Sequence, residues 1–379
     1  MYSFWVYSFI ASLLPFAVTM KGVASFDLSK NTSAIRWRPI LIIAFFLTCI
    51  LRGAAYDTGT DWWAYTEYYT ALMRGGHTAW GEHTEVGFQF LSEILAKYSV
   101  PIFIWYAIFH FFTYYSLLSF SRLFGFCIPF VLLIWYPFFF PMSCNIYRQY
   151  IAMSFFLVAN YYLLKKQWFL SMFLGMVSVL FHTMTVVYLP LVVFVWFLFK
   201  RNVSIGCKWI MLAVSLSHVV GLSMLSLVDE FSRNLSLLFS LGNGNVYEFS
   251  SQKFLEGQYG FSYSWLFLPI HLFWIWTGSR LLSHKEMTFF PYVYYFSCIY
   301  FVLFPICHEE FLMRFALYIE LFVPFMLGSL FYHCKKQKPT SLFLFYISLA
   351  PLLVRFVFIS MTKLFENHPF ETLFEHGLF

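Results

Sequence analysis

The sequence predicts an all-α membrane protein, a polytopic bundle of about twelve transmembrane helices with two longer extracytoplasmic loops. Sixty per cent of the 379 residues are hydrophobic and only 11% are charged, whereas soluble domains have roughly 25% charged residues. Apolar runs of about 17 residues or more, enough to cross a bilayer, recur along the chain. Lys and Arg residues concentrate in short segments between alternate runs, as they do in cytoplasmic loops.

The apolar runs define the expected spans in order. They lie at roughly 3–20, 37–53, 101–119, 124–142, 147–164, 167–181, 184–199, 208–228, 263–279, 288–306, 311–333 and 341–361. The first run has no basic residue before it, so we interpret it as a span and not as a cleavable signal. The run at 167–181 is short and crosses only where the bilayer thins or neighbouring helices shield its ends. We expect one integral membrane domain over residues 1–379.

The orientation of the spans follows from the basic residues in the short loops. Placing these loops, such as the one with Lys165 and Lys166, inside the cell gives one consistent alternation. Both termini and the two longer segments, 54–100 and 229–262, are then extracytoplasmic. The stretch 85–98 is too short to span comfortably, so we expect an amphipathic helix that is interfacial or re-entrant. The alternative is that 85–98 spans and another run does not.

Several functional classes find no support in the sequence. The seven cysteines form no CxxC pair, which leaves metal and redox motifs unsupported. Three residues separate Asp57 from Asp61, so no DxD metal motif occurs, and there is no phosphate-binding P-loop. The basic residues are dispersed among the loops, which gives no indication of nucleic-acid binding. We therefore expect no metal and no cofactor.

The stretch from Arg52 to Tyr65, RGAAYDTGTDWWAY, stands out at the end of the second span. It brings a cation, the carboxylates of Asp57 and Asp61, and several aromatic rings to one membrane edge. Such a combination can bind a charged lipid that carries sugars. The alternative is an ordinary interfacial loop, because Trp and Tyr favour that depth in any case.

Further polar residues fall at the same outer face in the predicted topology. Because charge inside a membrane is costly, each residue is a candidate for function. Alternatives remain open: Arg148 and Arg314 could form structural ion pairs with Glu309 or Glu85, and His182 could be a core histidine bonded to a carbonyl. The outer-face residues are Arg52, Asn145, Arg148, Gln149, His182, His308, Glu309, Glu310, Arg314 and Arg355.

Several arginines at one face favour binding of a diphosphate, since a guanidinium grips two phosphate oxygens at once. Aromatic rings in this region could stack on sugars. The candidate substrate-binding residues are Arg52, Arg148, Gln149, Arg314, Glu309, Tyr65 and Trp62. The candidate catalytic residues are Asp57, Asp61, Glu85 and His182, among which Asp61 and His182 are favoured as the base.

Several stretches of the chain resemble the EpsG family of bacterial polysaccharide-synthesis membrane proteins, which are Wzy-like polymerases. The most specific element is RQ-x-x-A, beginning at Arg148, followed by His182 near the end of the next span. The family often has glycine near Ala54–Tyr56, whereas this chain has Ala54, Ala55 and Tyr56 there. The stretches that carry the resemblance are 52–65, TEVGFQFLSEIL at 84–95, NIYRQYIAMSFFLVANYYLLKK at 145–166, WFLSMFLGMVSVLFHTMTVVYLP at 168–190 and RFALYIELFVP at 314–324.

The resemblance implies a polymerase of O-antigen, capsule or exopolysaccharide repeat units in a bacterial inner membrane. Such an enzyme moves a growing glycan from undecaprenyl diphosphate to the non-reducing end of a new lipid-linked unit, on the extracytoplasmic side. A lipid donor of this kind suits a glycosyltransferase that is metal-independent and inverting. The implied partners are the undecaprenyl-diphosphate-linked oligosaccharide, membrane lipids, a flippase and a chain-length regulator.

Three other functions compete with the polymerase. A transporter or flippase for the same lipid-linked oligosaccharide would place charge near the membrane midplane, and no polar row through a span is visible. A membrane acyltransferase that modifies the polysaccharide would need a His-Asp or Ser-centred site. A non-catalytic scaffold would need no arginines inside the membrane.

Overall fold

The computed structural model describes most of the chain, which forms two compact units. Unit 1 comprises Met1–Leu189 and Lys338–Phe379, and unit 2 comprises Pro190–Gln337. The described residues are 2–20, 37–58, 61–76, 78, 81, 84–139, 146–201, 205–223, 261–284, 287–305, 316–361 and 367–372. The predicted loop at 229–262 therefore lies almost entirely outside them.

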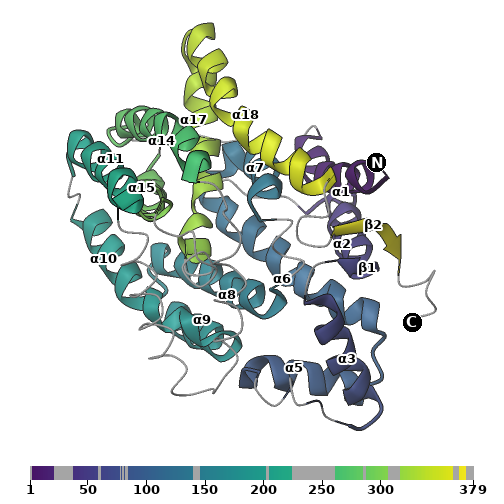
Figure 1. Cartoon of the computed structure of the whole chain (residues 1–379). Helices are drawn as coiled ribbons and strands as arrows, with labels where there is room; N and C mark the ends of the chain where they lie inside the picture. Colours follow the sequence, from purple (N-terminus) through teal and green to yellow (C-terminus); the bar gives the residue numbers. More distant parts are fainter. Residues whose placement is uncertain are drawn as a thin grey trace. The chain divides into compact units, whose positions relative to one another are not determined.

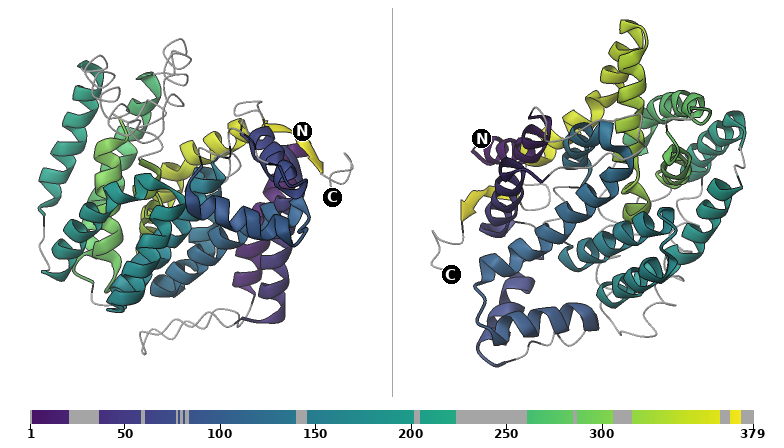
Figure 2. Two further views of the ribbon diagram at one scale, coloured as in Figure 1. Left: turned by 90° about the horizontal axis from the view of Figure 1, so that it is seen from below. Right: turned by 180° about the vertical axis from the view of Figure 1, so that it is seen from behind.

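Unit 1 contains the helices that position the candidate site. Its centre is α6, which packs against α2 and α8, while α8 forms an antiparallel pair with α9 (Figure 1). The two further views of Figure 2 show the same side-by-side arrangement of α8 and α9. The helices are α1 (Tyr2–Thr19), α2 (Pro39–Gly53), α3 (Trp62–Met73), α5 (Val86–Lys97), α6 (Ile102–Ser121), α7 (Ile128–Phe139), α8 (Tyr147–Leu164), α9 (Trp168–Phe181) and α18 (Pro339–Met361), with 3-10 turns η1 (Arg122–Cys127) and η3 (Thr183–Val187).

Unit 2 is also helical in its described residues. Tyr294 on α15 donates a hydrogen bond to the backbone carbonyl of Ile275 on α14, at 3.2 Å. Buried Glu320 accepts a hydrogen bond from Tyr300, at 2.9 Å, so it has a partner within the helices. The helices are α10 (Tyr188–Lys200), which begins in unit 1, α11 (Cys207–Ser223), α14 (Phe261–Leu281), α15 (Phe290–Leu303) and α17 (Val323–Lys336).

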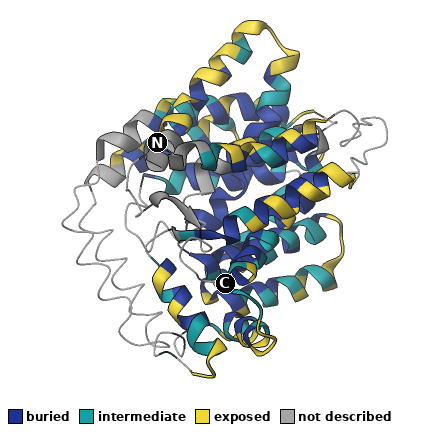
Figure 3. Cartoon of the chain, turned by 90° about the vertical axis from the view of Figure 1, so that its right-hand side faces the viewer, coloured by how far each residue is buried: buried dark blue, intermediate teal, exposed yellow. Residues whose placement is uncertain are grey.

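The helices agree with the predicted apolar runs. A helix lies in each of the twelve expected ranges, and α8 has the predicted bounds, 147–164. Three described stretches, Ile102–Phe124, Thr183–Lys200 and Ala316–Lys336, are long and apolar enough to cross a membrane, and shorter apolar helices accompany them. Along the helices of Figure 3, buried and exposed residues occupy different faces. The protein is thus a helical membrane protein, while the count of twelve spans and the single membrane domain stay predictions.

Helix α3 and a pair of short strands were not expected from the sequence. Helix α3 occupies part of a predicted outer loop, whereas α5 lies where the amphipathic helix 85–98 was expected. In addition, strand β1 (Ala55–Thr58) pairs antiparallel with β2 (Asn367–Thr372), near the end of the chain. The pair is beside α1 and α2 in Figure 1. Local sequence could not reveal this pairing, because each strand is short and its partner is distant in the chain.

The α8–α9 pair places polar residues at one end and basic residues at the other. Arg148 lies in the first turn of α8, and His182 directly follows the last residue of α9. Lys165 and Lys166 form the turn between the two helices, where Lys166 has a φ of 61°. Arg148 and His182 therefore lie at the same end of the pair, as the topological argument predicted.

Candidate functional site

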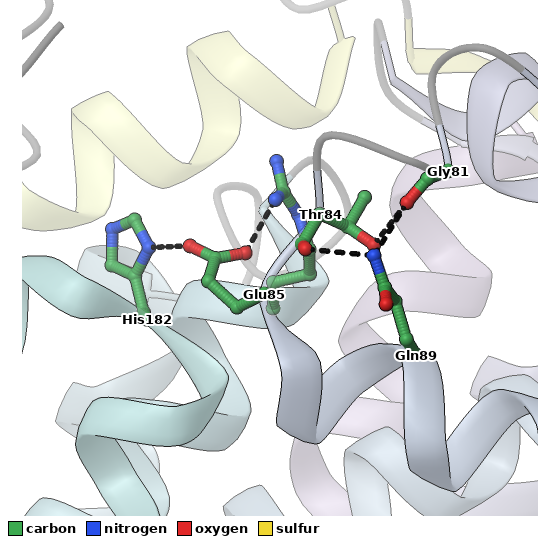
Figure 4. Close-up of polar contacts among 6 residues, drawn as sticks. Gly81, Thr84, Glu85, Gln89 and His182 are labelled. Carbon is green, nitrogen blue, oxygen red and sulfur yellow. Dashed lines mark hydrogen bonds and ion pairs between the residues drawn. The ribbon is translucent and has the colours of Figure 1, made fainter. Parts of the chain in front are cut away.

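The site is built around Glu85, the residue immediately before α5. A network of hydrogen bonds holds the chain that leads into Glu85 (Figure 4). The Thr84 hydroxyl donates to the carbonyl of Gly81 at 2.8 Å. The Gln89 amide, one turn into α5, donates to the carbonyls of Gly81 and Thr84, each at 2.9 Å. This network fixes the backbone from which the Glu85 side chain projects.

The Glu85 carboxylate binds two residues that are distant in the chain. Its Oε1 lies 2.7 Å from Nδ1 of His182, and its Oε2 lies 2.5 Å from Nη1 of Arg148. The three side chains come from the start of α5, the start of α8 and the end of α9. We call Glu85, Arg148 and His182 the polar trio.

His182 and Arg148 keep Glu85 ionised although the Glu85 side chain is only 11% exposed. Burial raises the pKa of the carboxyl, but the hydrogen bond to His182 and the charge of Arg148 outweigh burial and lower the pKa to about 2. The carboxylate is therefore charged throughout the physiological range. It can hold the His182 ring in one orientation and compensate the charge of Arg148.

Tyr65 extends the trio toward α3. Its side chain is 2% exposed and forms a hydrogen bond with Arg148. Burial raises the pKa of the Tyr65 hydroxyl, while Arg148 acts in the opposite direction, so the hydroxyl stays protonated. Asp61, the residue before α3, also acts electrostatically on Tyr65. Asp61 thus lies near the edge of the trio without belonging to it.

The backbone around His182 is held by neighbouring polar groups. His182 ends α9 in an extended conformation, with φ −161° and ψ 111°. Its N–H donates to the carbonyl of Ser178 at 3.0 Å, and its own carbonyl accepts from the N–H of Thr185 at 3.0 Å. The Ser178 hydroxyl in turn donates to the carbonyl of Ala152 on α8, at 2.6 Å. These bonds tie the end of α9 to the helix that carries Arg148.

A second group of polar residues lies where α2 meets α6. Arg52, in the last turn of α2, is 1% exposed, and its charge acts on His110 of α6, which is 2% exposed. The two helices can approach closely here because Gly53 has no side chain. A Cβ at this position would collide with the backbone of α6. The His110 ring packs edge-on against Tyr147, the neighbour of Arg148, with 5.8 Å between the ring centroids. Arg52 therefore lies beside the residues that surround the trio.

Nearly all of the residues described above lie within a match to a known protein family. The model of the EpsG family matches residues 38–372, from the start of α2 to the last residue of β2. The chain belongs to the EpsG family. No curated protein and no solved structure matches it. Membership makes the protein a polysaccharide-biosynthesis membrane protein of a family of glycosyltransferase-like polymerases.

In this EpsG-family protein the predicted site residues fall into distinct groups. Glu85, His182 and Arg148 are in contact, and Tyr65 adjoins them. Gln149 follows Arg148 and is 3% exposed. Further residues have other positions: Asp57 lies in β1, Asp61 precedes α3, Arg52 lies beside His110, and Glu309 and Arg314 lie outside the described residues.

The aromatic residues of the EpsG-family site differ in exposure. Trp62 is 0% exposed, and its ring lies 4.8 Å from that of Tyr56. Trp63, by contrast, is 53% exposed, so it offers a ring face to a ligand that Trp62 does not. Sequence reasoning counted Trp63 among the aromatic residues at the membrane edge but chose Trp62 and Tyr65 as the substrate-binding ones. It did not single out His110, although a histidine inside the span 101–119 was a visible signal. In the part of the chain that the structure describes, no three His, Cys, Asp or Glu side chains are grouped to hold a metal ion.

Proposed function

We propose that the protein polymerises the repeat units of a surface polysaccharide: O-antigen, capsule or exopolysaccharide. It transfers the growing glycan from undecaprenyl diphosphate to the non-reducing end of a lipid-linked repeat unit. The observation that carries the proposal is the polar trio, in which one carboxylate binds both a histidine and an arginine, in a chain of the EpsG family. Such a trio provides a base for a sugar hydroxyl beside a cation for a phosphate.

In this proposal His182 is the general base. Its Nδ1 faces the charged Glu85 carboxylate at 2.7 Å, so Nδ1 carries the hydrogen that is donated to Oε1. Nε2 then has the lone pair that accepts a proton. Glu85 orients the ring and compensates the positive charge that the ring gains, which is the role of a carboxylate behind a catalytic histidine. The geometry therefore favours His182 over Asp61 as the base.

Arg148 binds the donor diphosphate in this mechanism, and Arg52, which is buried beside His110, is the second arginine predicted for this role. A guanidinium has five N–H donors, enough to bind Glu85, Tyr65 and a phosphate oxygen together. Its fixed charge stabilises the negative charge that develops on the departing diphosphate. Gln149, beside Arg148, belongs to the predicted binding set, as do Glu309 and Arg314, which lie outside the described residues. The exposed ring of Trp63 is suited to stack on a sugar of the acceptor.

The reaction is a single displacement at the anomeric carbon. The acceptor oxygen forms a bond to that carbon as its proton passes to Nε2 of His182. The bond from the carbon to the phosphate oxygen breaks, and undecaprenyl diphosphate leaves with the electron pair. A double displacement would need a carboxylate nucleophile with a second carboxyl about 5 Å away. Glu85 is engaged by both His182 and Arg148, and Asp57 in β1 and Asp61 before α3 do not share a helix turn. We therefore propose inversion of configuration and no requirement for a divalent metal.

The proposed setting is the extracytoplasmic side of a bacterial inner membrane, where lipid-linked units arrive from a flippase. The basic turn at Lys165 and Lys166 lies at the opposite end of the α8–α9 pair from the trio, which supports this orientation. The twelve predicted spans and the two longer outer segments belong to the same proposal. A chain-length regulator is the partner that would act on the growing glycan.

The test uses purified protein in nanodiscs with a lipid-linked repeat unit. Wild-type protein should make polymer, and His182→Ala should lower the rate by roughly 10²–10⁴, the usual contribution of a general base. The control is His284→Ala, which changes an exposed histidine of unit 2 and should leave the rate unchanged. Absence of polymer with the wild-type protein, or normal polymer with His182→Ala, would contradict the proposal.

Two readouts of the same assay test the chemistry. NMR of the polymer should show inversion of the donor's anomeric configuration at each new linkage, and retention would exclude a single displacement. EDTA should leave the rate unchanged. Loss of activity in EDTA with recovery on addition of magnesium would contradict a metal-independent reaction.

A further inference from the structure

Helices α5 and α9 meet through their backbones at Gly87. A Cβ atom built at this position would lie 2.8 Å from the Leu180 carbonyl oxygen, 2.9 Å from its carbonyl carbon and 3.1 Å from its Cβ. The Leu180 side chain itself is 52% exposed. The close contact is therefore made by the main chain of α9, which cannot move aside as the end of a flexible side chain could.

This contact is adjacent to the central hydrogen bond of the site. Gly87 follows Glu85 by two residues, and Leu180 precedes His182 by two residues. Gly87 and Glu85 lie at the start of α5, and Leu180 and His182 lie at the end of α9. Any displacement of α5 from α9 at Gly87 must therefore also displace Glu85 from His182, whose atoms are 2.7 Å apart.

We propose that Gly87 is a positioning residue for the transfer reaction: its lack of a side chain seats α5 on the last turn of α9 and thereby sets the bond between Glu85 and His182. The inference rests on the proposed function of His182 as base. It adds a residue that touches no reacting atom and acts only through the placement of Glu85.

The physical requirement for glycine is steric. Real Cβ atoms essentially never approach other atoms more closely than 3.0 Å, so two of the three contacts at Gly87 would have to lengthen. The chain entering α5 is held by the Gln89 network, so α5 would move with Glu85 attached. A hydrogen bond weakens steeply as it lengthens. Misplacement of a catalytic group by about 1 Å can cost roughly 10²-fold in rate.

Gly175 provides a matched control on α9. It is also a helical glycine, but a Cβ there would meet only the Leu189 side chain, at 3.9 Å, which is an ordinary contact. Replacing Gly175 by alanine also removes glycine from a helix interior, which favours the helix. The two alanine variants thus differ in whether a neighbouring backbone must move.

The test compares Gly87→Ala with Gly175→Ala in nanodiscs at matched protein amounts. Gly87→Ala should accumulate in membranes and polymerise at least about tenfold more slowly, whereas Gly175→Ala should behave as wild type. Wild-type polymerisation by Gly87→Ala would overturn the proposal. Failure of Gly87→Ala to accumulate would also overturn it, because Gly87 would then serve folding and not the placement of Glu85.

A double-variant comparison tests whether Gly87 acts through Glu85. If it does, adding Gly87→Ala to Glu85→Gln should cost much less than Gly87→Ala costs alone, because residues that act through one interaction are not additive. Full additivity would overturn the proposal. Wild-type activity of Glu85→Gln itself would instead refute the proposed function, so the two failures are distinguishable.

The separation of kcat from KM provides a second readout. Glu85 contacts the proposed base and Arg148 and does not hold the acceptor sugar, so its misplacement should lower kcat of Gly87→Ala and leave KM for the lipid-linked unit unchanged. A raised KM with an unchanged kcat would assign the loss to substrate binding and would overturn the proposal.

Discussion

Glu85 and His182 are joined by a hydrogen bond of 2.7 Å across 97 positions of the sequence. The bond connects the start of α5 to the end of α9, and Arg148 binds the same carboxylate from the start of α8. Because a single carboxylate serves both partners, changes at any of the three residues should affect the other two.

Arg148→Lys should retain membrane insertion but polymerise at least about tenfold more slowly. Lysine can still pair with Glu85, but an ammonium lacks the planar fork that binds two oxygens of a phosphate while contacting Tyr65. The measurement is polymer yield at matched protein amounts. Arg122→Lys, at the start of η1, is the control and should behave as wild type. Equal polymer yields from the two variants would count against phosphate binding by Arg148.

The thermal stability of the protein should depend on Glu85 with a defined sign. The folded pKa of about 2 lies below the ordinary value of 4.5, so the folded protein binds fewer protons than the unfolded chain between these values. The stability due to the ionised carboxylate is therefore fully present above pH 4.5 and is lost as the pH falls toward about 2. In detergent, the difference in Tm between wild type and Glu85→Gln should be constant from pH 7 to 5 and shrink below that range.

Glu93→Gln is the control for this pH dependence, because Glu93 lies on the exposed face of the same helix. It should melt as wild type at each pH. A Tm difference for Glu85→Gln that grows as the pH falls would contradict a lowered pKa for Glu85.

The predicted orientation can be tested within unit 1 with single cysteines in a cysteine-free background. Gly76→Cys, exposed after α3, should react with a membrane-impermeant thiol reagent in intact spheroplasts. Gln167→Cys, exposed at the basic turn between α8 and α9, should react only after permeabilisation. Labelling of Gln167→Cys in intact cells would reverse the topology, and with it the extracytoplasmic side of the proposed reaction.

The sequence predicts the helices of this protein well because each depends on local composition. Apolar runs define α8 and α9 closely, and the basic turn at Lys165 indicates which ends of these helices lie together. The cost of charge in a membrane was sufficient to select Arg148 and His182 as candidates. These inferences need no knowledge of which helix packs against which.

The contacts within the site depend on packing and were not predictable in the same way. The sequence left Glu85 as one of several candidate bases and as one of two possible ion partners of Arg148. Only the approach of α5 to α9 assigns its carboxylate to both His182 and Arg148. The exposure of Trp63 and the burial of Trp62 likewise follow from how α3 packs, since both are tryptophans at adjacent positions. The pairing of β1 with β2 joins residues that lie still further apart in the sequence, so local composition could not reveal it.

Removal of residues 367–379 should impair polymerisation although every helix of unit 1 is retained. Strand β2 pairs with β1 in a register that sets Glu371 opposite Tyr56. The Tyr56 ring packs on Trp62, which leads into α3 and Tyr65. A lone strand of four residues has no partner for its backbone groups, so β1 should lose its conformation and loosen the start of α3. Polymer length and yield, at matched protein amounts, are the measurements.

The matched control is removal of residues 373–379, which leaves β2 intact and ends the chain where the family match ends, at residue 372. This shorter truncation should polymerise as wild type, because the pairing with β1 is preserved. The difference between the two truncations isolates the strand, since both lack the same final residues. Normal polymer from the longer truncation would show that β1 keeps Asp57 and Tyr56 in place without β2, and would remove the C-terminal strand from the account of the site.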